Sequence, residues 1–198
     1  MIKSSRIARR SRQLIARFAR DSRGLAAVEF AFIVPLMLVL LFGMIDTSSG
    51  VAIDRKVTLT TRSLSDLVSQ GTSVSQTDLK NFFGFGVAIM APYGVNSGEL
   101  EQKVTQLAVD GSKNVKVVWS YSATIANNTA TVTTGYAKDT VVTTVPANLL
   151  VANTYLIWSE VKYSYTPITG YVLGKTVIPL SDETYTRPRQ SDKVDYTS

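Results

Sequence analysis

Residues 25–45 read LAAVEFAFIVPLMLVLLFGMI, an almost wholly apolar run that is interrupted by one acid, Glu29. As an α-helix with a rise of about 1.5 Å per residue, the run would be roughly 31 Å long, close to the bilayer hydrocarbon thickness of about 30 Å. Thirteen of its 21 residues are Leu, Ile, Phe or Val, and their insertion free energies sum to roughly −4 to −8 kcal/mol. Glu29 lies only about 6 Å into the run, where an acid costs less than at the bilayer centre. Residues 25–45 therefore predict a transmembrane helix.

A basic leader, residues 1–24, precedes the apolar run and carries eight Lys or Arg against the single acid Asp21. Since the whole chain has 21 basic and 15 acidic side chains, 13 and 14 remain without the leader, and the pI of about 9.5 is a property of the leader. Basic charge beside a membrane segment favours a cytoplasmic amino terminus and contact with anionic lipid, and it argues against nucleic-acid binding. The Arg-rich amphipathic leader is also typical of a mitochondrial transit peptide, which stays open as an alternative.

The junction between leader and run, residues 23–30, reads RGLAAVEF: a charged flank, a glycine, four apolar residues, an acid and an aromatic residue. This motif resembles the processing site of type IV pilin-like precursors, in particular that of TadE-like pseudopilins of the tight-adherence (Flp-type) pilus system. The resemblance implies cleavage after Gly24 by a membrane prepilin peptidase on the cytoplasmic side, which makes Leu25 the new amino terminus. Glu29 and Phe30 complete the motif. Glycine suits a scissile position because it lets a protease approach the backbone without a side-chain clash.

Two residues inside the run invite a functional interpretation. Glu29 is either a tolerated acid near a helix end or a carboxylate that compensates the α-amino group created by cleavage, on its own chain or on a neighbouring subunit. We favour the second interpretation because acids inside membrane segments are costly and usually functional. Pro35 removes a backbone donor and is expected to kink or loosen the helix, which membrane helices tolerate.

Beyond the run, Asp46 and the Thr-Ser-Ser-Gly stretch at 47–50 indicate the exit into water, but no proline stops the helix there. Apolar residues recur at helical spacing and predict an amphipathic continuation over 46–70: Ile53, Val57, Leu64, Leu67 and Val68. The result is one helix over about 25–69, on the order of 67 Å long.

The remaining residues, 71–198, predict a periplasmic α+β domain. Ser75 with Asp78 indicates a capping box at the start of a second helix that ends near Met90, in which Gly84 and Gly86 allow close packing. Strands are expected at 103–109, 115–121, 156–165 and about 175–187, the first two joined at Asp110-Gly111. Alternation places Val115, Val117, Trp119 and Tyr121 on one core face, and Ile157, Val161, Tyr163 and Tyr165 on another strand's face.

Two features of residues 71–198 allow alternative structures. Pro179 confines the last strand to an edge or a bulge, and residues 122–155 are compatible with a short strand or a long loop. Two further pieces resemble the same family, Val161–Pro167 and Tyr185–Arg189. A long transmembrane helix, a short second helix and an antiparallel sheet together predict an α+β, pilin-like fold.

Catalysis is not expected, because the chain has neither His nor Cys, which removes His-based triads, Cys nucleophiles and Cys/His zinc sites. The neighbouring acids Glu99 and Glu101, like Asp182 and Glu183, are best interpreted as solvated surface groups. No cofactor or metal is expected.

The resemblance implies a minor pilin-like subunit in the bacterial inner membrane, with its carboxyl-terminal domain in the periplasm and a role in pilus assembly and adhesion. Its expected partners are the prepilin peptidase, other pilin-like subunits, the inner-membrane assembly platform and membrane lipid. The main alternative is an uncleaved, signal-anchored envelope protein whose periplasmic domain binds a ligand or a cell-wall partner.

Overall fold

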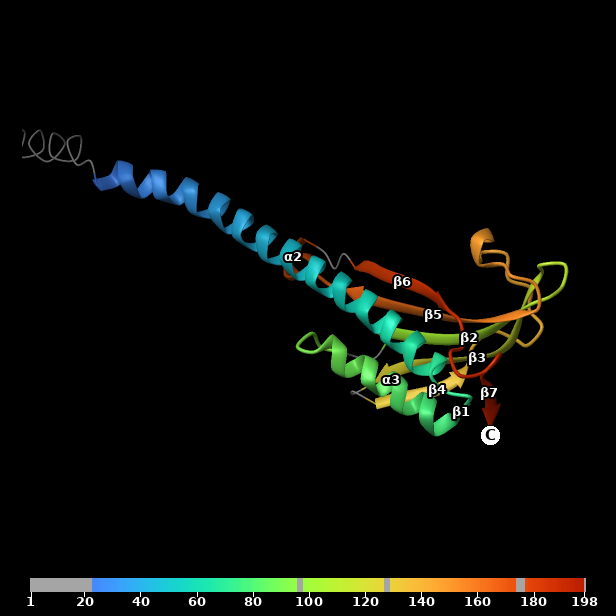
Figure 1. Ribbon diagram of the computed structural model, residues 1–198. Coiled ribbons are helices and arrows are strands. Elements are labelled where there is room, and N and C mark those ends of the chain that lie inside the picture. The colour runs from blue at the N-terminus through green and yellow to red at the C-terminus, as the bar shows by residue number, and fades with distance from the viewer. Residues whose placement is uncertain (1–22, 96–97, 127–128, 174–176, 198) are drawn as a thin grey trace, which may run out of the picture. The chain divides into compact units, whose positions relative to one another are not determined.

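The computed structural model describes residues 23–95, 98–126, 129–173 and 177–197. The chain divides into two compact units, residues 1–45 and 46–198, and the basic leader lies outside the described residues apart from Arg23 and Gly24. A single helix, α2 (Arg23–Ser69), runs through the boundary (Figure 1), as the sequence predicts. It remains α-helical through Pro35, and the expected kink stays a prediction.

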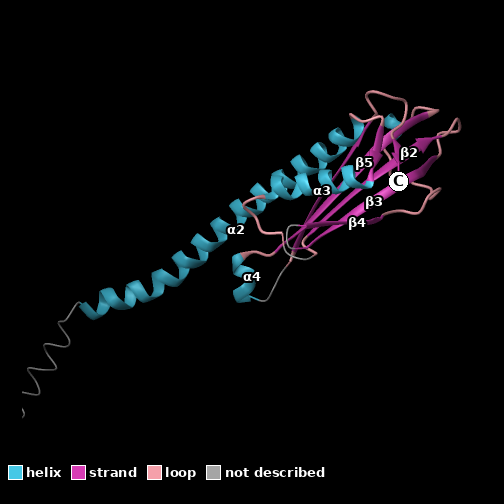
Figure 2. Ribbon diagram, turned by 90° about the horizontal axis from the view of Figure 1, so that it is seen from below, coloured by secondary structure: helices cyan, strands magenta, loops and turns pink. Residues whose placement is uncertain are grey.

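The second unit is an α+β domain, which confirms the predicted fold class. Five antiparallel strands form one sheet in the order β4-β3-β2-β5-β6, and a parallel pair, β1 with β7, lies apart from it. Figure 2 shows α2 and α3 along the sheet. After α2 the elements are β1 (Ser73–Ser75), α3 (Gln76–Met90), β2 (Leu100–Val109), β3 (Val115–Ala126), β4 (Thr129–Thr134), η1 (Ala147–Leu149), β5 (Thr154–Tyr165), α4 (Ile168–Leu173), β6 (Ile178–Thr186) and β7 (Asp195–Thr197).

The main core lies between the helices and one face of the sheet. From α2 it receives the predicted apolar stripe, of which Ile53, Val57, Leu64 and Val68 are fully or almost fully buried, whereas Leu67 is only partly buried. The sheet contributes alternate residues of β2, β3 and β5 to the same cluster, and α3 contributes its buried side: Leu79, Phe83, Met90, Leu100, Val104, Trp119, Ala123, Ile125, Ile157, Val161 and Tyr163.

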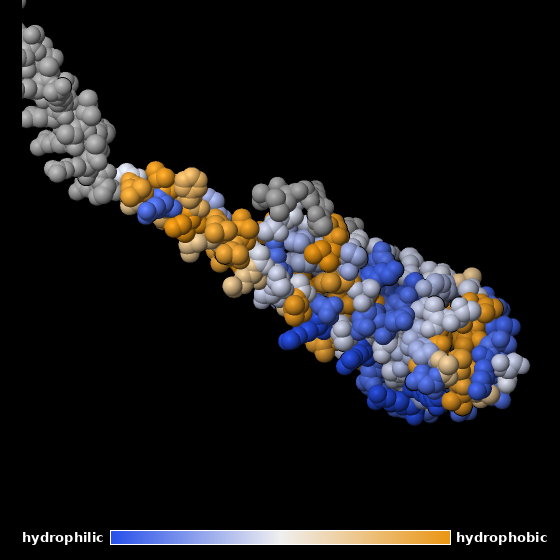
Figure 3. Space-filling view, turned by 90° about the horizontal axis from the view of Figure 1, so that it is seen from above, coloured by the Kyte–Doolittle hydropathy of each residue, from blue (hydrophilic) through white to orange (hydrophobic). Residues whose placement is uncertain are grey.

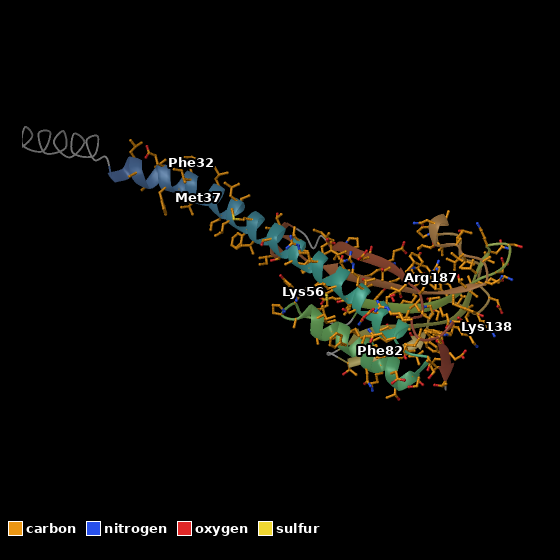
Figure 4. All side chains as sticks on the ribbon, viewed as in Figure 1. Phe32, Met37, Lys56, Phe82, Lys138 and Arg187 are labelled. Carbon is orange, nitrogen blue, oxygen red and sulfur yellow. The ribbon has the colours of Figure 1, made fainter. Side chains whose placement is uncertain are left out.

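Helix α3 is held at both ends by polar contacts. At its start the Ser75 and Asp78 side chains form the predicted capping box, and the hydrogen bonds from Ser75 hold the pKa of Asp78 below its ordinary value. At its end the Lys56 ammonium of α2 donates to the carbonyls of Ile89 and Ala91 at 2.7 and 2.6 Å, where α3 leaves carbonyls without helical partners. Lys56, labelled in Figure 4, therefore fastens α3 to α2.

A β-bulge divides the sheet into two packing regions. The register between β2 and β3 shifts between Gln106 and Leu107, so that Gln106 faces Trp119 but Leu107 faces Val117. A bulge of this kind reverses which face a side chain occupies. The prediction that Val115 and Val117 share a core face with Trp119 is therefore wrong, because these two valines pack in a second cluster on the opposite face.

The second cluster is covered by the segment that joins β4 to β5. It contains Leu107, Val109, Leu156 and Trp158 beside the two valines, together with Val145 of the covering segment. Three rings stack across it: the Trp158 ring lies 5.4 Å from that of Tyr136 and 5.8 Å from that of Tyr185, centroid to centroid. Burial raises the pKa of Tyr185 to about 12. These contacts give the long connection a fixed place on the sheet.

Most other expectations for this domain are confirmed. The hairpin at Asp110-Gly111, the third strand with its inward face, and the position of Pro179 in the edge strand β6 are as predicted. Residues 122–155 hold both a strand, β4, and a long loop.

The sequence did not predict β1, β7 or α4.

The packing of α3 on the sheet gives a first testable prediction. A Cβ atom at Gly86 would lie 2.8 Å from the Gln102 amide carbon and 3.0 Å from Thr60 Cγ2, and Gln102 cannot easily retreat because its amide donates to the Phe83 carbonyl at 2.9 Å. We expect Gly86→Ala to lower the free energy of unfolding by about 1–3 kcal/mol, measured by denaturant unfolding of the detergent-solubilised full chain.

The matched control is Gly84→Ala in the same helix. A Cβ atom at Gly84 meets no atom within 4 Å, and replacing a helical glycine by alanine stabilises by up to about 1 kcal/mol. Equal effects of the two substitutions would contradict the close approach of α3 to the sheet at Gly86.

Candidate functional site

The predicted site residues lie in the first turns of α2. Gly24 is the second residue of the helix, and Leu25, Glu29 and Phe30 follow with exposed side chains. The Gly24–Leu25 peptide bond lies in the first described turn of α2. A cut there would leave the rest of α2 intact. The space around the Gly24 Cα is open, since a Cβ atom added there would meet no atom within 4 Å.

Leu25 and Glu29 are four residues apart and therefore lie on the same face of the helix. If the chain began at Leu25, its α-amino group would stand about one turn from the Glu29 carboxylate, which is exposed. This geometry is compatible with either form of the predicted charge compensation, within one chain or between two.

The remainder of residues 25–45 presents apolar side chains outward. Apart from the half-buried Val34, the exposed fractions of the large apolar side chains range from 39% at Ile45 to 78% at Phe32. Figure 4 shows Phe32 and Met37 standing out from the helix. In Figure 3 the described surface of this segment is mostly in the apolar colour. An exposed apolar surface of this extent is typical of a segment that meets lipid or other protein chains.

Among the described residues, α2 is the helix that is long and apolar enough to cross a membrane, with a mean hydropathy of 2.6 over its most apolar 18 residues, none of them buried. The described residues contain no group of three acidic side chains that could hold a metal ion. The candidate functional site is therefore the apolar part of α2 with the residues at its two ends.

At the end of the run Asp46 makes contacts that the sequence did not predict. We expected it to mark the exit into water, but only 9% of it is exposed. Its carboxylate accepts hydrogen bonds from the backbone N–H groups of Ile168 and Thr169, at 2.8 and 2.9 Å, and from the Thr169 hydroxyl at 2.5 Å. A carboxylate in this position satisfies the free donors at the start of α4 and interacts favourably with the positive end of the helix.

Tyr165 adds a further contact between the Asp46 region of α2 and the segment before α4. Its hydroxyl lies 3.4 Å from the Asp46 carbonyl, and a Cβ atom at Gly50 would lie 3.7 Å from its ring. The only local signal for this site is Pro167 just before α4, because proline often precedes or opens a helix. The partner of α4 could not be read from that signal, since it lies about 120 residues earlier in the chain.

We expect Asp46→Ala to release α4. Loss of the carboxylate leaves two N–H groups in the first turn of α4 without their acceptor, so their hydrogen exchange should accelerate by about tenfold or more. Hydrogen–deuterium exchange of the detergent-solubilised full chain, read on peptides covering 160–173, measures this. Asp54→Ala, which removes an exposed acid of the same helix, is the control. Unchanged exchange in the Asp46 variant would show that the carboxylate does not hold α4.

Comparison with known families gives one match. The model of the family described as TadE-like protein matches residues 24–62, a segment that begins at Gly24 and includes the apolar run and the first part of its amphipathic continuation. Comparison with curated proteins gives no match, and comparison with solved structures gives none. The match does not reach Val161–Pro167 or Tyr185–Arg189, whose likeness stays a prediction. Residues 24–62 thus match the TadE-like protein family, which confirms the resemblance seen at the Gly24 junction and is consistent with a TadE-like pilus protein.

Proposed function

We propose that this chain is a minor pilin-like subunit of a bacterial tight-adherence pilus machine. Residues 25–45 span the inner membrane with the amino terminus in the cytoplasm, and the domain that begins at Asp46 lies in the periplasm. A prepilin peptidase removes the leader after Gly24. The observation that carries the proposal is the family match over 24–62, which coincides with the outward-facing apolar helix.

The proposed role is assembly rather than catalysis. Before assembly, lipid tails contact the apolar surface of the helix. During assembly, other transmembrane helices replace these lipid contacts, because lipid tails and helix side chains are similarly apolar. The sheet domain then determines which partner the subunit meets, among like subunits and the assembly platform. Its place as a minor component that primes or caps a filament follows from analogy with the family.

Processing is tested by a bulky substitution at the proposed cleavage position. We expect Gly24→Phe to remain at full length in its native bacterium, because a large side chain obstructs the approach of a protease to the backbone. The wild-type chain should begin at Leu25, as read by intact-mass spectrometry of the purified protein.

Gly43→Phe is the matched control. Gly24 and Gly43 belong to the same helix, and an added Cβ atom meets no atom within 4 Å at either position, so neither substitution disturbs packing within the chain. The Gly43 variant should be processed normally. A mature-sized Gly24→Phe protein, or a wild-type chain that keeps its leader, would refute processing at Gly24 and favour the uncleaved envelope protein.

The role of Glu29 is tested separately. We expect Glu29→Gln to be processed but to form far fewer contacts with neighbouring subunits, because the new α-amino group then lacks its compensating charge in lipid. Since the chain has no Cys, Leu36→Cys provides a single reporter in the exposed run, and disulfide-linked dimers in membranes can be counted with and without Glu29→Gln. Equal dimer yields would contradict the charge-compensating role.

A further inference from the structure

Three exposed apolar side chains lie at the end of the sheet domain that Asp46 holds. Ile168 opens α4, Val177 directly precedes β6 and Ile178 begins it; their exposed fractions are 51%, 50% and 41%. Ile178 faces Tyr165 across the β5–β6 ladder, and Tyr165 reaches Asp46 through its hydroxyl. We call these three residues the α4 tip.

The hydrogen bonds of Asp46 hold Ile168 beside the residue that directly follows the apolar run in the chain. Asp46 directly follows Ile45, the last residue of the run, and its carboxylate binds the N–H of Ile168 at 2.8 Å. The polar layer on each side of a bilayer is about 5–8 Å deep, as the difference between its total and hydrocarbon thickness shows. If residues 25–45 span the bilayer, Ile168 therefore lies within the outer polar layer.

The chemistry of this end of the domain suits that layer. The α4 sequence, ITGYVL, has no charged residue, and the partly exposed Tyr165 lies beside it at Asp46. Apolar side chains beside tyrosines are typical of segments at the boundary between headgroups and acyl chains.

The opposite end of the sheet provides a comparison. Val141 is 59% exposed and forms a β-bridge with Lys116 of β3. Lys116 pairs with Ala108 of β2, and Ala108 pairs in turn with Tyr155, near the start of β5. Val141 therefore lies at the end of the sheet where β5 begins. Tyr155 and Tyr165 are ten residues apart on β5, about 33 Å at the rise of a strand. Exposure alone therefore does not distinguish the α4 tip; its nearness to Asp46 does.

We propose that the α4 tip docks on the phospholipid surface of the membrane that residues 25–45 span, with its apolar side chains at the boundary of the headgroups in the outer leaflet. This inference rests on the proposed membrane insertion. It gives the domain a second contact with the bilayer, besides the helix that anchors it.

The test uses the absence of Cys from the natural sequence. Ile168→Cys, Val177→Cys, Val141→Cys and Leu36→Cys are each labelled with nitrobenzoxadiazole, and the full chain is reconstituted into vesicles of phosphatidylethanolamine and phosphatidylglycerol. The vesicles contain phosphatidylcholine with a nitroxide placed either near the headgroup or near the end of the acyl chain. Quenching of the probe by each nitroxide reports its depth.

We expect the probes at 168 and 177 to be quenched by the shallow nitroxide, about twofold more strongly than by the deep one, as the outer position predicts. The probe at 36 should be quenched most by the deep nitroxide, and the probe at 141 by neither. Two positions in the tip protect the test against a local disturbance from one label.

Each other outcome overturns the proposal. If the probe at 36 is quenched but those at 168 and 177 behave like that at 141, the docking fails and membrane insertion stands. A blue-shifted, unquenched emission at 168 and 177 would show that protein rather than lipid covers the tip. Absence of quenching at 36 would refute both the docking and the insertion on which it rests.

Discussion

One helix has to satisfy two different environments, and the change between them falls at Asp46. Up to Ile45 the large apolar side chains of α2 face outward around the helix, whereas beyond it a narrow apolar stripe is buried against the sheet and α3. The sheet domain depends on that second half, because the helix face of the sheet would otherwise expose its apolar residues to water. Since α2 is unbroken across the boundary, the candidate membrane span and the helix that completes the core of the sheet domain are parts of the same element.

The interface between α2 and the sheet is more polar than its stripe suggests. Thr61, Ser65, Gln102, Gln106 and Ser159 are all buried there. The Thr61 hydroxyl donates a hydrogen bond to the Val57 carbonyl, and the Gln102 amide donates one to the Phe83 carbonyl. The Gln106 amide has no hydrogen-bond partner among the described residues. Buried polar groups of this kind contribute little net stability. The hydrogen bond of Gln102 instead fixes the position of α3 on the sheet. It also holds the Gln102 side chain against Gly86, which leaves no room for a Cβ atom there.

The sequence predicted the elements whose signals are local. Helical periodicity gave α2, Ser75 and Asp78 gave the start of α3, and Asp110-Gly111 gave the β2–β3 hairpin. Pro179 placed β6 at an edge for a simple reason, since proline cannot donate to a central ladder. The junction at Gly24 was found by its motif, and the family match begins at that residue.

Features that depend on distant partners could not be predicted. The register shift at Gln106/Leu107 leaves Val118 of β3 without a partner in β2. This apolar residue at a position expected to be polar does not by itself indicate a bulge, so the prediction placed Val115 and Val117 on the wrong face. β1 and β7 are three residues each and exist only as a pair formed across the domain. Asp46 gave no sign of its role, because a carboxylate after an apolar run is equally typical of solvent exposure and of capping a helix elsewhere in the chain.

The bulge also determines the character of the face of the sheet opposite the helices. By turning Val115 and Val117 away from the helices, the bulge supplies apolar surface that packs against the covering segment around Trp158. Backbone hydrogen bonds between residues 139–142 and Val115 and Val117 fix the same segment. Past the bulge the same face is polar and charged, lined by Glu101, Lys103, Glu160 and Lys162. Its apolar part is thus already used within the domain, and its remaining part suits polar contacts. Among the described residues, the extensive exposed apolar surface lies instead on residues 25–45 of α2.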